Sequence, residues 1–154
     1  MIHEAFADYW AMSSFAAQSA RNYFDIACWG EWYAAGTCER SLASTVAIPA
    51  MGTLRNDAHD RSQVWSSVLL QIFTECRDED VVDTLIVLSH VGGHGLVAEP
   101  TFDYFAGRMV ALDRAMYGGA HQALLCSVFR QHGLPTLPGE CVTGGAGVSP
   151  QPPR

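Results

Sequence analysis

Apolar residues recur every three to four positions over most of the chain, which is the spacing of helices that pack one face on a core. Glycine and proline interrupt this pattern and divide the chain into separate segments. The acidic run of Asp78, Glu79 and Asp80 favours a helix start there, because carboxylates are stabilised at the positive end of a helix dipole. The pattern predicts about five helices, at residues 2–20, 60–76, 78–92, 100–117 and 120–132.

Two stretches lack a helical period. Residues 21–58 contain several glycines, a proline and only a short β-branched run at 45–48, which predicts one long ordered loop. Residues 139–154 are rich in glycine and proline and predict a flexible tail. We therefore expect a mainly α fold, an irregular bundle of about five helices with one long ordered loop at residues 1–138, followed by the tail.

The composition fits one packed domain and argues against two classes of partner. Of the 154 residues, 49% are hydrophobic and 16% charged, so a packed core is expected rather than disorder. The net charge is −7, with nine arginines and no lysine, so we expect no nucleic-acid partner. The most apolar stretch, residues 81–97, contains Asp83, two histidines and three glycines, so we expect no membrane span, which needs ~20 apolar residues.

The first residues show no secretory signal, because a basic segment and an apolar segment are both missing there. They already have the pattern of a helix interior without a preceding cap. This pattern suggests a chain that begins partway through a domain.

The five cysteines include no CxxC pair, so a structural zinc site built from paired thiolates is not expected. Cys28 and Cys38 flank a short loop that a disulfide could close in an oxidising compartment. They could equally be small apolar side chains in a core, and the sequence leaves both interpretations open.

Two acidic residues lie on one face of the first predicted helix. Glu4 and Asp8 are four residues apart, and the helix is apolar on nearly all sides. One interpretation is a pair of solvated acids near a helix N-terminus. The other is a metal ligand and a neighbouring carboxylate that orients a histidine ligand. No arginine or lysine lies within one turn, so a neutral isostere of either residue is expected to leave the stability unchanged or raised.

Three tracts of the chain resemble the C-terminal half of thermolysin-like and fungalysin-like zinc metallopeptidases. His-Glu-Ala-Phe-Ala-Asp-Tyr-Trp at residues 3–10 resembles the segment that supplies their third zinc ligand, in which three residues separate Glu from Asp. Asn-Asp-Ala-His-Asp-Arg-Ser-Gln-Val-Trp at 56–65 resembles their catalytic-histidine segment. Residues 102–134 resemble their last two helices, so the resemblance covers nearly the whole chain up to Pro135 and implies the fold of their helical C-terminal subdomain.

The resemblance implies a role for each of five residues. Glu4 would bind zinc, and Asp8 would hold one of two histidine ligands. His59 would donate a hydrogen bond to the oxyanion of the tetrahedral intermediate. Arg55 would bind a substrate carbonyl, although the segment that links it to His59 is much shorter than in thermolysin. Asp57 would orient His59, although its offset from that residue differs from the family's pattern.

One part of the family's site is missing from the chain. No HExxH is present, and this motif supplies two zinc histidines and the general-base glutamate. His90 and His94 have the histidine spacing but no glutamate between them, and their adjacent glycines favour a loop, so we interpret both as loop histidines. We interpret His121 and His132 as ordinary surface or helix-cap histidines.

The leading hypothesis is therefore the C-terminal part of a secreted zinc metalloendopeptidase, inactive without the N-terminal half that would carry HExxH. Zinc would bind only when that half is present, and the substrate would be a peptide or protein. The sequence does not indicate whether the protein binds calcium. The first alternative is a non-catalytic helical module for binding or assembly, descended from such a peptidase. The second is an unrelated helical protein that binds a metal through His90 and His94.

Overall fold

The computed structural model describes residues 1–16, 25–31, 35–91, 101–135 and 138–142. Within them the chain is mainly helical, as the sequence predicts, with one two-stranded sheet. The elements are α1 (Ile2–Ser13), β1 (Cys28–Trp29), β2 (Arg40–Ser41), the 3-10 helix η1 (Ile48–Thr53), α3 (Ala58–Cys76), α4 (Glu79–His90), α5 (Phe102–Tyr117), α6 (Gln122–Gln131) and α7 (Gly139–Val142).

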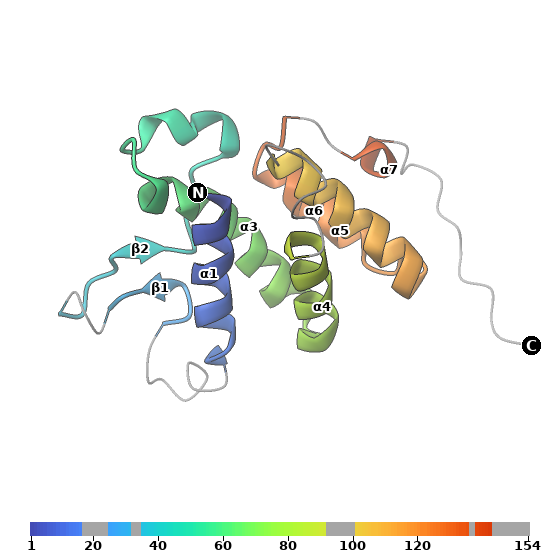
Figure 1. Cartoon of the computed structure of the whole chain (residues 1–154), viewed down its shortest axis with the longest axis horizontal. Coiled ribbons are helices and arrows are strands. Elements are labelled where there is room, and N and C mark those ends of the chain that lie inside the picture. The colour runs from blue at the N-terminus through green and yellow to red at the C-terminus, as the bar shows by residue number, and fades with distance from the viewer. Residues whose placement is uncertain (17–24, 32–34, 92–100, 136–137, 143–154) are drawn as a thin grey trace, which may run out of the picture.

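Helix α3 runs through the middle of the molecule and contacts most other elements. Helix α1 and the β1–β2 hairpin lie on one side of it, and α4, α5 and α6 on the other (Figure 1). Its buried positions recur along the helix and include Val68, Leu69 and Ile72. Asp57 begins α3 by accepting hydrogen bonds from the backbone N–H groups of residues 59 and 60, so the helix starts two residues before the predicted start at residue 60.

Helix α1 ends earlier than its apolar pattern predicts. The prediction continued it to residue 20, but Ser14 and Phe15 form a turn. The hydroxyl groups of Ser13 and Ser14 both donate to the carbonyl oxygen of Trp10, at 3.4 and 2.7 Å. Side-chain bonds of this kind compete with the helix ladder and slightly destabilise it. Residues 17–20 of the predicted helix lie outside the described part of the chain.

An aromatic stack joins α3 to the neighbouring helices. The ring of Trp65 is fully buried and stacks on Phe102 and Phe129, with centroids 5.0 and 6.5 Å away. Its indole N–H donates to Nε2 of His90 at 2.9 Å, so Nδ1 of that ring carries the proton and donates to the Ile86 carbonyl at 2.8 Å. His90 is the last residue of α4, inside the helix predicted at residues 78–92, so its interpretation as a loop histidine is wrong. His94 lies outside the described residues.

Two disulfide bonds close loops at opposite ends of the chain. Cys28 pairs with Cys38 beside the hairpin. Of the two interpretations that the sequence left open for these cysteines, the structure therefore has the disulfide. Cys126 of α6 pairs with Cys141 of α7, a bridge that the sequence analysis did not anticipate. It tethers the first residues of the segment predicted to be a flexible tail, where residues 139–142 form a helical turn. Residues 143–154 lie outside the described part.

Among the described residues, none of the helices combines the length and the apolar character that a membrane crossing needs.

Candidate functional site

Glu4 on α1 and His59 in the first turn of α3 meet at the surface. Oε2 of Glu4 lies 3.0 Å from Nδ1 of His59, although 55 positions separate the two residues in the sequence. The two side chains are 40% and 53% exposed, so water reaches both groups. The packing of α1 against α3 brings them together (Figure 1). The site therefore contains a solvent-accessible carboxylate–imidazole pair.

Asp8 has a cation that the sequence did not reveal. Nε and Nη2 of Arg40 donate to its two carboxylate oxygens at 2.9 and 2.6 Å. The Ser62 hydroxyl lies 3.2 Å from Asp8 Oδ2 and 2.6 Å from the His59 carbonyl oxygen. The Arg40 guanidinium also covers the Trp29 ring, 3.7 Å from its centroid. Asp8 is thus neither solvated nor unpaired, which corrects both the solvated interpretation and the expectation of a carboxylate without a cation.

Asp57 fixes the backbone at His59 rather than its ring. Its Oδ1 accepts from the His59 and Asp60 N–H groups at 2.8 and 3.2 Å. These hydrogen bonds lower the pKa of the Asp57 carboxyl, and the bond from the His59 N–H is the largest cause. The predicted ring-orienting contact is made by Glu4 instead. Asp57 therefore positions His59 by holding the start of α3.

Arg55 and Asp60 form an exposed pair at the rim of the site. Nε of Arg55 lies 3.3 Å from Oδ2 of Asp60, and the arginine side chain is 88% exposed. An ion pair in such contact with water holds its geometry weakly, because water competes for both charges. Arg40, whose side chain is only 10% exposed, is the more firmly held guanidinium of the two.

All five residues singled out from the sequence line one open pocket of about 710 Å³. Ala7, Ala11 and the Trp29 ring supply its apolar wall, and the remaining lining residues are Glu39, Arg40 and Asp60. A carboxylate, an imidazole and a fixed guanidinium therefore surround a space large enough for part of a peptide.

Sequence reasoning missed Arg40, the residue that holds Asp8. A buried carboxylate needs a positively charged partner, and this was the only indication in the sequence. It did not identify the partner, because the chain has nine arginines. Arg40 follows the Cys28–Cys38 loop by two residues, and β2 carries it to α1 through the pairing of Trp29 with Arg40 in the hairpin. Nothing local in the sequence predicts that pairing.

The described residues do not form a metal site by themselves. A four-coordinate zinc site needs three or four protein donors. No group of three or more histidine, cysteine, aspartate or glutamate side chains is arranged to hold a metal in the part of the chain that the structure describes. Glu4 has the chemistry of a zinc ligand, but Asp8 is occupied by Arg40. Further donors would have to come from elsewhere.

The chain matches no family model, no curated protein and no solved structure. The interpretation of the site therefore depends on the geometry of its residues.

Proposed function

We propose that this chain is the helical C-terminal part of a zinc metalloendopeptidase, in which Glu4 is a zinc ligand and His59 donates to the oxyanion. The observation that supports the proposal is the contact of Glu4 with His59 at the wall of an open pocket. A shared function requires these two residues to lie on one surface. Their contact supports this because 55 positions separate them in the sequence, so it does not follow from local chain geometry. The mainly helical fold is compatible with the C-terminal subdomain of such a peptidase.

Glu4 is a carboxylate of the site that can exchange its partner. It is half-exposed and contacts a histidine that is itself half-exposed. If Glu4 leaves this contact, water can solvate both groups, so no unpaired charge is left buried. Two histidines from the missing N-terminal half would complete the ligand set with Glu4. The chemistry that a bound zinc supplies is polarisation of the scissile carbonyl and activation of a water molecule.

His59 can donate a hydrogen bond into the pocket. In its imidazolium form it donates from Nδ1 to Glu4 and still has the Nε2–H group for a second acceptor. The capped first turn of α3 fixes the backbone from which the ring extends. A fixed donor aimed at developing negative charge lowers the barrier of acyl transfer.

Arg40 is better placed than Arg55 to bind a substrate carbonyl. Asp8 and the Trp29 ring hold its guanidinium at the wall of the pocket, so little conformational entropy is lost when a further acceptor binds. We therefore assign the carbonyl-binding role to Arg40. Asp8 then acts by holding this guanidinium.

The two disulfides support a secreted parent protein. Disulfide bonds persist in oxidising compartments and are rare in the reducing cytosol. The chain has bridges at Cys28–Cys38 and Cys126–Cys141, so four of its five cysteines are paired. A secreted endopeptidase would meet peptide and protein substrates outside the cell.

The purified chain alone is expected to be inactive. The general-base glutamate and two zinc histidines would come from the missing half, and each contributes to the same chemical step. Casein hydrolysis with and without a zinc chelator measures this. Chelator-sensitive cleavage by the chain alone would show that the site is complete without a second half.

The DNA upstream of the Met1 codon is expected to encode the missing motif. If the proposal is correct, an in-frame HExxH lies a short helix and turn before Glu4, because both segments must reach one zinc ion. Sequencing the locus, followed by mass spectrometry of the natural polypeptide, measures this. An in-frame stop codon just before Met1, with no HExxH upstream, would contradict the proposal.

A further inference from the structure

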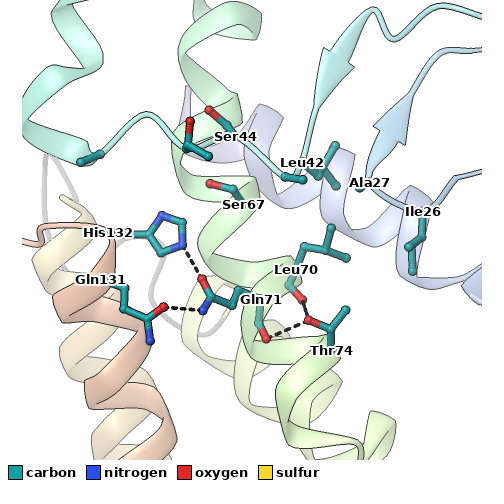
Figure 2. A pocket seen from close by; sticks show the side chains of 13 residues that line it. Ile26, Ala27, Leu42, Ser44, Ser67, Leu70, Gln71, Thr74, Gln131 and His132 are labelled. Carbon is teal, nitrogen blue, oxygen red and sulfur yellow. Dashed lines mark hydrogen bonds between the residues drawn. The ribbon is translucent and has the colours of Figure 1, made fainter.

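A second pocket lies between the middle of α3, the end of α6 and the segment that follows β2. Its volume is about 550 Å³, and it shares no lining residue with the pocket of Glu4 and His59. Figure 2 shows Leu42 and Ile26 on one side, Leu70 on α3, and the polar side chains of Gln71, Gln131 and His132 at the other end. The volume is within the range of small-molecule sites, roughly 300–1,000 Å³.

The described lining of this pocket carries no formal charge. It consists of aliphatic side chains, hydroxyl groups, two glutamines and one histidine, in a chain whose net charge is −7. Burial lowers the pKa of His132, so its ring is neutral at neutral pH. A charged ligand would lose its hydration here without gaining a counter-ion. The lining therefore favours a neutral ligand.

The polar end of the pocket has a fixed direction of hydrogen bonding. Nε2 of Gln71 lies 2.7 Å from a carboxylate oxygen of Glu75, which can only accept, so this atom is the amide nitrogen. The same nitrogen donates to Gln131 Oε1 at 2.8 Å. Gln71 Oε1 therefore faces His132 and accepts from its Nε2–H at 2.8 Å (Figure 2). With the proton on Nε2, Nδ1 of this neutral ring is a hydrogen-bond acceptor.

The acceptor at Nδ1 of His132 has no partner among the described residues. Two hydroxyl groups of the wall are already engaged in local bonds, as Ser67 donates to the Val64 carbonyl and Thr74 donates to the carbonyls of Leu70 and Gln71. We propose that this pocket binds a neutral, largely apolar small molecule that donates one hydrogen bond from a hydroxyl or N–H group to Nδ1 of His132. The apolar body of the ligand would lie against Leu42 and Leu70.

Three matched naphthalene probes test this proposal on the full chain by equilibrium dialysis at neutral pH. 2-Naphthol is neutral and has a hydroxyl donor, 2-methoxynaphthalene lacks the donor, and 2-naphthoate is charged. We expect saturable binding of 2-naphthol, about fivefold weaker binding of the methoxy compound, since it lacks one neutral hydrogen bond, and at least about tenfold weaker binding of the naphthoate. In the His132→Phe chain the difference between naphthol and its methyl ether should disappear.

A pair of exposed alanines provides the location control. Ala43→Trp places a large ring at an exposed position of the pocket lining, and Ala50→Trp places the same ring on η1 outside it. The first variant should lose at least tenfold in naphthol affinity, and the second should bind as the unmodified chain does. No saturable naphthol binding, equal binding of all three probes, or equal effects of the two tryptophans would overturn the proposal. None of these results depends on the Glu4 and His59 site.

Discussion

The Asp8→Asn variant is expected to lose about 3–5 kcal/mol of the free energy of unfolding. Both side chains of the Asp8–Arg40 pair are at least nine-tenths buried, and two direct N–H···O bonds join them. Asparagine keeps the shape of the side chain but removes its charge, which leaves the Arg40 guanidinium buried without a counter-ion. Urea unfolding followed by circular dichroism measures the loss.

Glu4→Gln is the matched control for this variant. It removes the same charge from the same helix, but from a half-exposed pair with His59, so a change below about 1 kcal/mol is expected. A variant with Asp8→Leu and Arg40→Met together should recover much of the lost stability, because apolar residues can replace a buried ion pair. Equal urea midpoints for Asp8→Asn and the unmodified chain would show that the pair contributes nothing. From the sequence, a neutral isostere of Glu4 or Asp8 was expected to leave the stability unchanged or raised. We now expect this for Glu4 alone.

The helices were predictable because their signals are local. Apolar spacing and the acidic start at Asp78 placed α3 to α6 within about two residues, the usual scatter of helix ends. The end of α1 was missed because the apolar pattern continues past Ser13 and Ser14, where the chain forms a turn. The hairpin was missed because its two-residue strands are too short for a periodic signal.

The other features that sequence reasoning missed depend on pairing between distant segments. Arg40 reaches Asp8 across 32 positions, and the Cys126–Cys141 bridge needs α7 beside α6. His90 was assigned to a loop because glycines follow it, but its neighbours in space are aromatic rings from three other helices. Glu4 and His59 were singled out because each belongs to a short tract that resembles the peptidase family, and their proximity was expected only from that resemblance.

If the upstream DNA encodes HExxH as proposed, Glu4→Gln is expected to abolish activity in the longer polypeptide that contains this motif. An amide is a weaker zinc ligand than a carboxylate, so zinc content should fall with activity, by about a hundredfold or more in hydrolysis rate. His59→Gln should instead lower kcat by about 10²–10³ with zinc retained, because it removes a donor to the oxyanion and no ligand. The two variants thus distinguish the metal-binding role from the oxyanion-binding role.

The most direct test of the proposed site is zinc content measured together with chelator-sensitive casein hydrolysis in that polypeptide, for Glu4→Gln and for Glu79→Gln. Glu79 is an exposed glutamate in the first turn of α4 and serves as the matched control. We expect that Glu4→Gln loses both zinc and activity, while Glu79→Gln keeps one zinc per chain and the full rate. A Glu4→Gln protein that keeps its zinc and its activity would contradict the assignment of Glu4 as a ligand, and with it the proposed function.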